Sequence, residues 1–367
     1  MFRPPGAVRS ATLRPVPALT APLPFVTAEL PGSGGTLRAT PEDFRVDEIP
    51  AYLPSGSGPH LYLLVEKRGR TTRDALRTLA RALGVPERDA GYAGLKDRAA
   101  VTTQWLSFPA ARDPDPAALA APGLTVKSVS RHANKLRPGH VRANRFEVTV
   151  RGGDLARARA CAAALEARGL PGYYGPQRFG ADGGNAEVGR ALLRGERTPE
   201  ALRAGRDRFL RRLCISAFQS ELFNRWLAER IQDGLFAAAL AGDVMKKLDT
   251  GGLFLCEDPD AEGPRVARFE IAPAGPMFGH KMKPASGEAA AREARILAAS
   301  GIDAADLARG GGEAEGTRRA ARLPVQVALE ADDDGYRARF ELPRGNYATV
   351  VMRELMKVEG ALPEDAD

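Results

Sequence analysis

The chain has 367 residues, 44% of them hydrophobic, which is enough to build cores for about two domains. Its formal net charge is +7 and Arg supplies most of the 53 basic residues, a balance compatible with a nucleic-acid partner. Three scattered cysteines argue against a disulfide framework or a zinc site, and no apolar run approaches the length of a membrane span, so we expect a protein of the reducing cytoplasm.

The first third of the chain begins with an irregular segment and then gives a clear helix signal. Residues 1–35 are rich in Pro, Ala and Gly, and the prolines interrupt every apolar run, which is unlike a signal peptide. Thr71 and Asp74 form a capping-box pattern, apolar residues then recur at helical spacing, and Gly84 and Pro86 follow. We therefore predict a helix that starts after Thr71 and ends near Gly84.

Alternating apolar residues predict strands towards both ends of the chain. Phe146, Val148 and Val150 alternate with polar neighbours, as in a half-buried strand. A second alternation runs from 325 to 342 and is interrupted by Asp-Gly at 334–335, a dipeptide typical of hairpin turns.

The middle of the chain is more helical. Helical patterns cover residues 155–168, 216–231 and 288–299, and a glycine-rich run at 310–316 predicts a flexible loop. The aromatic residues of the second helix follow one helix face, so we expect them to be core rather than a binding platform.

The segment GYAGLKDRAAVTTQW at 91–105 carries the strongest chemical signal. Asp97 lies between Lys96 and Arg98, after two glycines that give the backbone room to turn and to approach a ligand. Because neighbouring cations favour the charged form of a carboxylate, we expect Asp97 to stay ionised and to be a candidate nucleophile or base near a polyanion. The alternative is a solvated surface turn without function.

Five segments carry motifs that occur in a recognisable order. They are PEDFRVDE at 41–48, GLKDR at 94–98, NRF at 144–146, YYGPQRFG at 173–180, and LPRGNYAT at 342–349 followed by Arg353-Glu354. Together they resemble the signature motifs of the TruD family of tRNA pseudouridine synthases. The chain departs from the family pattern at Arg38, where Lys is frequent, and at Gly172, where Asn is common.

The resemblance implies a fold and a division into domains. The expected fold class is α+β, with a pseudouridine-synthase catalytic core around a mostly antiparallel central sheet. Residues 1–169 and 325–367 would form this core, and an α/β insertion domain of the TRUD type would occupy 170–324. The cleft between the two would hold the RNA.

The resemblance also implies an activity. The chain is expected to isomerise uridine 13 of tRNA to pseudouridine, as a monomer and without metal or organic cofactor. A pseudouridine synthase acting on another RNA is an alternative, and so is a non-catalytic RNA-binding or ribosome-assembly factor on the same fold.

Residue roles follow from the same motifs. Asp97 matches the catalytic Asp, which could attack the ribose C1′ or remove the C2′ proton, and the sequence leaves both routes open. The candidate substrate-binding residues are Phe146 and Phe340 against the flipped base, Asn144 near its edge, and Arg38, Lys96, Gln104 and Arg178 as phosphate or base contacts. Their alternatives are core packing for the aromatics, and salt bridges or loop-bracing hydrogen bonds for the polar side chains.

Overall fold

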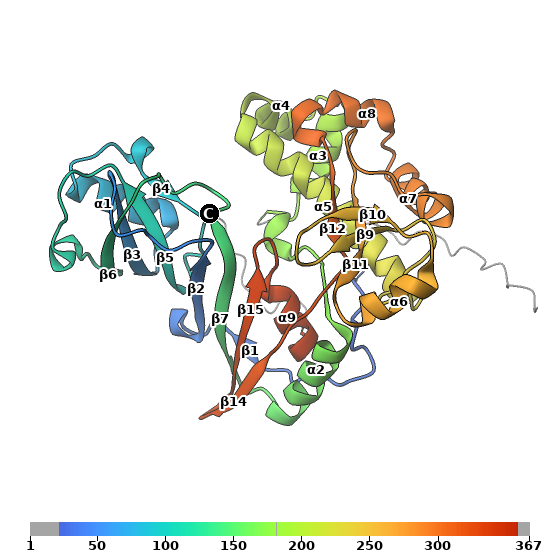
Figure 1. Ribbon diagram of the computed structural model, residues 1–367, viewed down its shortest axis with the longest axis horizontal. Helices are drawn as coiled ribbons and strands as arrows, with labels where there is room; N and C mark the ends of the chain where they lie inside the picture. The colour runs from blue at the N-terminus through green and yellow to red at the C-terminus, as the bar shows by residue number, and fades with distance from the viewer. Residues whose placement is uncertain (1–21, 181, 359–367) are drawn as a thin grey trace, which may run out of the picture.

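The protein contains one large β-sheet and two small ones (Figure 1). The structure is a computed structural model that describes residues 22–180 and 182–358. Nine strands form the large sheet in the order β14-β15-β7-β2-β5-β3-β6, with β1 added beside β7 and β4 beside β5. The strands are β1 (Thr36–Leu37), β2 (Phe44–Pro50), β3 (His60–Arg68), β4 (Gly91–Tyr92), β5 (Val101–Phe108), β6 (Leu124–His132), β7 (Val141–Arg151), β14 (Ala328–Asp332) and β15 (Gly335–Pro343).

The large sheet is antiparallel except where β2 lies parallel to β5. This parallel pair lies in the middle of the sheet, and β7 joins it to the C-terminal hairpin. The α+β class and the mostly antiparallel sheet predicted from the sequence are therefore confirmed.

One face of this sheet carries two separate hydrophobic cores. A first core packs β2, β7 and β15 against α2 (Leu155–Arg168) and α9 (Ala348–Met356), and a second packs β3, β5 and β6 against α1 (Thr72–Ala82). Buried polar side chains lie between the two cores: Glu48, Lys67, Thr72, Lys96, Thr102 and Gln104. We call these six residues the polar seam.

A single row of paired residues shows how the face changes character. From β15 to β3, the strand registers align Phe340, Phe146, Val46, Thr102 and Lys67 as successive neighbours. Paired residues on adjacent strands point to the same face. The row therefore runs from aromatic core to a buried cation within five strands.

The middle of the chain forms a second lobe around one buried helix (Figure 1). Trp226 and Phe223 of that helix, α5, face β11, where a side chain at Gly275 would collide with both rings. Glycine is thus required there by close packing. The elements are α3 (Asn185–Arg194), α4 (Pro199–Arg206), α5 (Arg208–Gln232), α6 (Pro259–Ala267), α7 (Gly287–Ala299), α8 (Ala304–Arg309), and the sheet of β9 (Val244–Lys247), β10 (Leu253–Leu255), β11 (Ile271–Met277) and β12 (Thr317–Ala320).

A short strand pair marks where the chain enters and leaves this lobe. β8 (Leu170–Pro171) pairs antiparallel with β13 (Arg322–Leu323), next to the domain boundaries predicted at 170 and 324. The first hydrophobic core continues across this pair into α3 and α5. The boundaries themselves stay a prediction.

All strand pairs of the four-stranded sheet in the second lobe are antiparallel. The predicted α/β insertion therefore combines helices and strands, but it has no parallel sheet among the described residues.

Most predicted elements are present. The capping box at Thr71 opens α1, and α2 has its predicted bounds. Two starts differ from the predictions. α5 begins at Arg208 rather than at 216, because the Asp207 side chain caps two backbone N–H groups there. β14 begins at Ala328 rather than at 325. No helix among residues 22–180 and 182–358 is both long and apolar enough to cross a membrane.

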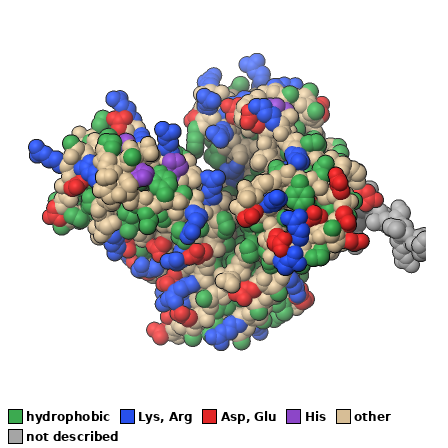
Figure 2. Space-filling model, in the orientation of Figure 1, with side chains coloured by type: hydrophobic (Ala, Val, Ile, Leu, Met, Phe, Trp, Pro, Cys, Tyr) green, Lys and Arg blue, Asp and Glu red, His purple; other side chains and the backbone are tan. Residues whose placement is uncertain are grey.

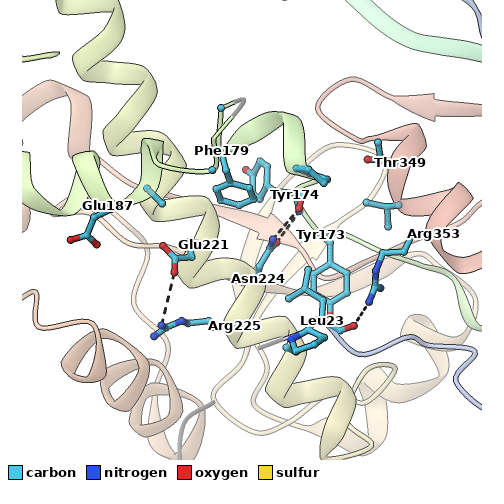
Figure 3. A pocket seen from close by; sticks show the side chains of 18 of the residues that line it. Leu23, Tyr173, Tyr174, Phe179, Glu187, Glu221, Asn224, Arg225, Thr349 and Arg353 are labelled. Atoms are coloured by element: carbon cyan, nitrogen blue, oxygen red, sulfur yellow. Dashed lines mark hydrogen bonds and ion pairs between the residues drawn. The ribbon is translucent and has the colours of Figure 1, made fainter. Parts of the chain in front are cut away.

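A cavity of about 620 Å³ opens where α3, α5 and α9 meet (Figure 3). Aromatic rings of Tyr173, Tyr174 and Phe179 line it together with Glu221 and Arg225 of α5. Burial raises the pKa of Glu221 to about 7, and its carboxylate lies 3.9 Å from the Arg225 guanidinium. Asp97 does not line this cavity.

The raised pKa predicts that Glu221 makes stability depend on pH. Between the ordinary pKa of 4.5 and about 7, the folded protein holds a proton that the unfolded chain has released, so burying this carboxyl costs more as pH rises. Glu221→Gln should therefore raise the free energy of unfolding by about 1 kcal/mol or more at pH 8 and change it little at pH 4. Urea denaturation across this pH range checks it.

Glu187, in the same cavity, is the matched control. A hydrogen bond from Arg190 lowers its pKa, so Glu187→Gln should not stabilise the protein at pH 8. An equal effect of Glu221→Gln at pH 4 and pH 8 would contradict the assignment.

Candidate active site

Asp97 lies in the loop between β4 and β5, and its side chain is 39% exposed. Its Oδ2 accepts a hydrogen bond of 2.9 Å from the guanidinium of Arg38, whose own side chain is only 3% exposed. The cation that pairs with this carboxylate therefore comes from a distant part of the chain rather than from Lys96 or Arg98 beside it.

Arg38 is itself held in a specific conformation. It follows β1 with φ at +56°, a left-handed backbone that non-glycine residues seldom adopt. Its guanidinium stacks over the Phe44 ring at 4.2 Å from the centroid. A strained residue next to a reactive group is a common feature of functional sites. Phe44 belongs to the PEDF motif, but sequence reasoning gave it no role.

Three phenylalanines continue from Arg38 into the core. Phe44 meets Phe146 edge-on at 6.2 Å, and Phe146 stacks on Phe340 at 5.3 Å. The strand register places Phe146 directly opposite Phe340. The structure thus brings both candidate base-binding aromatics together, but Phe146 is only 7% exposed and Phe340 covers one side of its ring.

Lys96 does not contact Asp97 or project into solvent as the sequence suggested. Its Nζ donates a hydrogen bond of 2.6 Å to Glu48, and both side chains are buried. A buried ammonium needs a counter-ion, and the motif glutamate on β2 supplies one. Lys96 thus has an internal partner in this structure, and its phosphate contact stays a prediction.

Lys67 fastens the backbone of the same loop. Its Nζ donates to the backbone carbonyls of Lys96 (2.9 Å), Asp97 (2.7 Å) and Arg70 (2.6 Å), and the residue is 1% exposed. Sequence reasoning missed it. The available signal was a lysine at the position where the alternation of Leu61, Leu63 and Val65 on β3 calls for an apolar residue.

Gln104 forms hydrogen bonds that brace the Asp97 loop, in agreement with the loop-bracing alternative given for it above. Its Nε2 donates to the Gly94 carbonyl at 3.0 Å, and its Oε1 accepts from Thr72 Oγ1 at 2.9 Å. Thr72 Oγ1 in turn accepts from the Lys96 backbone N–H at 2.9 Å. Gln104 is nearly fully buried, so it is a support of the loop in this conformation.

The two glycines of the motif make room for protein atoms rather than for a ligand. A Cβ at Gly94 would lie 3.2 Å from Lys96 Nζ, and one at Gly91 would lie 2.3 Å from the Leu136 carbonyl oxygen. Neither glycine has a positive φ. The expected ligand approach at these positions is therefore not what requires glycine.

Asn144 and Thr102 each keep a buried polar atom without a hydrogen-bond partner. Among the described residues, nothing donates to Asn144 Oδ1 and nothing pairs with Thr102 Oγ1. The register places Asn144 opposite Glu48, two residues from Phe146 on the same face of β7. Buried polar atoms are rarely left unpaired, so the free Oδ1 of Asn144 marks a place where a ligand could supply the partner.

Arg178 lies apart from this group, in a short 3-10 helix (Pro176–Arg178). It donates to the hydroxyls of Ser216 and Ser220 on α5 and lies 5.5 Å from the Tyr174 ring. Among residues 22–180 and 182–358, it forms no hydrogen bond or ion pair with Asp97. Its bonds to α5 agree with the loop-bracing alternative given for the polar side chains.

The fold is α+β, and a partly exposed carboxylate lies on a loop whose backbone is held by buried side chains. Enzymes that use a carboxylate as nucleophile or base have this arrangement. Comparison with known proteins identifies the kind of enzyme. The family model "tRNA pseudouridine synthase D (TruD)" matches residues 23–204 and 199–355.

Relatives cover nearly the whole chain. The tRNA pseudouridine synthase D of Anaeromyxobacter dehalogenans (strain 2CP-1) is 79% identical over 345 residues, 94% of this chain and 99% of its own length. That of Thermus thermophilus is 43% identical over 362 residues, with 94% and 97% covered. A crystal structure assigned to TruD from Methanosarcina mazei has a TM-score of 0.73 at 25% identity and covers 91% of this chain and 96% of its own.

The chain therefore belongs to the TruD family of tRNA pseudouridine synthases, which are isomerases. This confirms the family resemblance found in the sequence motifs.

The Lys96–Glu48 geometry predicts a structural cost when either partner is removed. Lys96→Met leaves a buried carboxylate without a counter-ion and should lower the free energy of unfolding by about 3 kcal/mol. Lys127→Met, which breaks an exposed pair with Glu66, should cost less than about 1 kcal/mol. Urea denaturation measures both.

The double variant Glu48→Gln/Lys96→Met should be less destabilised than the sum of the two single variants, because the groups that need each other leave together. If Lys96→Met keeps full stability but loses tRNA affinity, Lys96 contacts phosphate and the ion pair is not its role.

Proposed function

We propose that this protein isomerises uridine 13 of tRNA to pseudouridine, with Asp97 as the catalytic carboxylate. The observation that carries the proposal is the arrangement at Asp97: a partly exposed carboxylate, paired with buried Arg38, on a loop whose backbone Lys67 holds. A carboxylate so held can be presented to a ribose without moving the chain that carries it.

The chemistry needs only a rearrangement of bonds. The bond between N1 and the ribose C1′ breaks, the uracil turns, and C5 bonds to C1′ while C5 loses its proton and N1 gains one. As the base departs, C1′ becomes electron-poor. Asp97 then either adds to C1′ or removes the C2′ proton to give a glycal, and both routes need the ionised carboxylate beside the sugar. Substrate and product are isomers, so the net reaction requires no oxidant and no water.

Arg38 would keep Asp97 oriented while the substrate arrives. The Phe44 ring and the backbone after β1 fix the guanidinium, which holds Asp97 Oδ2 through a hydrogen bond of 2.9 Å. The polyanionic substrate brings further negative charge to this point, and a buried cation beside Asp97 offsets the repulsion.

The uracil would be received beside Asn144 and Phe146. A flipped base presents donors and acceptors on its edge, and Asn144 Oδ1, which has no donor among the described residues, can accept one of its N–H groups. Phe146 lies two residues along the same strand and supports the base through its small exposed part. Phe340 then acts by backing Phe146.

The alternatives stay distinct from this proposal. A synthase acting on another RNA would use the same site, and only the modified position tells the two apart. A non-catalytic RNA-binding factor would bind tRNA without needing the carboxylate of Asp97.

Asp97→Asn should abolish turnover while the fold and tRNA binding persist, because the amide keeps the shape and loses the negative charge. Tritium release from tRNA labelled at uridine C5 should fall by at least about 1,000-fold, on the order of a lost nucleophile or base. Asp47→Asn is the control, since Asp47 is exposed on neighbouring β2. Near-normal release by Asp97→Asn would refute the assignment.

Phe146→Leu should slow turnover even when the variant is fully folded. Stacking of a base on an aromatic contributes roughly 1–3 kcal/mol, so turnover should drop about tenfold or more. Phe108→Leu, in the second core, should lose comparable stability and keep its rate once folded. Full activity of folded Phe146→Leu would show that Phe146 serves packing alone.

A further inference from the structure

Three cations from both lobes gather at the junction between them. Lys246 comes from β9, Arg319 from β12, and Arg344 from the turn after β15. Arg344 is exposed, and the other two are half-buried. Figure 2 shows Lys and Arg side chains around the hollow that separates the two lobes.

Arg319 is anchored by neutral groups. Its Nε donates to the Gly172 carbonyl at 2.7 Å and its Nη2 to Asn346 Oδ1 at 3.1 Å, while its guanidinium stacks on Tyr174 at 4.1 Å. Gly345, the neighbour of Arg344, lies against it, since a Cβ there would be 3.8 Å from Arg319 Nη1. The guanidinium is thus fixed in place without being neutralised.

Arg344 connects this place to the loop of Asp97. Its Nη1 donates to the Gly139 carbonyl at 2.9 Å, and the Gly139 N–H donates to the Ala93 carbonyl at 2.8 Å. Ala93 begins the run that ends at Asp97. Two hydrogen bonds therefore link the third cation to the catalytic loop.

None of the three forms an ion pair with a carboxylate of residues 22–180 or 182–358. Lys246 Nζ donates to the carbonyl of Arg318 at 3.5 Å, which places it next to Arg319. Burial together with the charges of Arg319 and Arg344 lowers the pKa of Lys246, in keeping with this placement. Like charges held together by neutral anchors are unfavourable unless an anion joins them. The fold keeps this arrangement in the free protein, which makes it a prepared anion site.

We propose that Lys246, Arg319 and Arg344 bind backbone phosphates of the RNA next to the nucleotide that Asp97 modifies. The identity of the RNA rests on the proposed function, whereas the anion site itself does not. Guanidinium groups with fixed planes suit phosphate oxygens, and an ammonium adds a third donor. Because the site draws on both lobes, binding there would hold the RNA across the junction.

The site is distinct from the phosphate contacts that the sequence suggested. Arg38 pairs with Asp97, Lys96 pairs with Glu48, and Arg178 donates to two serine hydroxyls. Arg38 and Lys96 thus have acidic partners, whereas Arg178 and the three junction cations have none in the part of the chain that the structure describes. The anion site therefore adds Lys246, Arg319 and Arg344 to the phosphate contacts that the sequence suggested, and of these three only Arg344 belongs to one of the motifs.

The test measures tRNA binding by full-length variants as a function of salt. Lys246→Gln and Arg344→Gln should each weaken binding about tenfold, the usual effect of one charged hydrogen bond, and each should reduce the log–log salt slope by about one. Lys247→Gln is the control, because Lys247 is the next residue on the same strand and exposed. It should change affinity less than about twofold. If both variants bind like the control, the site is not used.

A second measurement locates the phosphates. Single phosphates on either side of uridine 13 are replaced, one at a time, by neutral methylphosphonates. At one or more positions the replacement should weaken tRNA binding by the wild-type protein. At the same positions it should weaken binding by Arg344→Gln only slightly further. Additive losses at every position tested would overturn the placement next to the target. Neither measurement depends on turnover. If the Asp97→Asn variant still converted uridine to pseudouridine, the catalytic proposal would be wrong but the proposed anion site would be unaffected.

Discussion

Arg38 and Asp97 meet at the point where the large sheet changes from one hydrophobic core to another. The partners are 59 residues apart in the chain, so only the finished sheet brings them together. β1 beside β7 places Arg38, and the β4–β5 connection places Asp97. If either end of the sheet shifted, the carboxylate would lose its cation. The geometry around Asp97 thus depends on the register of the whole sheet.

The polar seam is what allows a charged loop to lie over a buried face. A sheet with a single continuous core would bury the loop's carbonyls against apolar side chains, which costs several kcal/mol when they are unpaired. Here Lys67 donates to two of them, the carbonyls of Lys96 and Asp97, and Thr72 with Gln104 fixes the segment from Gly94 to Lys96. Buried ionic groups add little net stability, because desolvation offsets their attraction. Their value in this fold is to permit one loop conformation.

Sequence reasoning succeeded where the signal is local. A capping box and a helical stripe define α1, and an alternation defines β7, because neighbours in the chain are neighbours in these elements. It failed where a side chain chooses a distant partner. Nothing around Lys96 says that Glu48 lies beneath it, and charge alone made Lys96 resemble a phosphate contact. The same limit explains why Phe44 and the junction cations were not found, whereas Lys67 interrupts the local alternation on β3 and was overlooked.

Both lobes contribute residues to the proposed anion site. Arg319 and Lys246 belong to the small sheet, whereas Arg344 follows the last strand of the large one. An RNA that spans the junction would contact both, which offers a physical reason for inserting a second lobe into an otherwise continuous sheet.

The central claim is that Asp97, fastened on the polar seam, performs the isomerisation at one tRNA position. A map of pseudouridine in tRNA tests it most directly, in cells lacking this protein and in the same cells given either wild type or Asp97→Asn. We expect pseudouridine at position 13 only with the wild type. Pseudouridine at position 13 with Asp97→Asn, or none there with the wild type, would contradict the account.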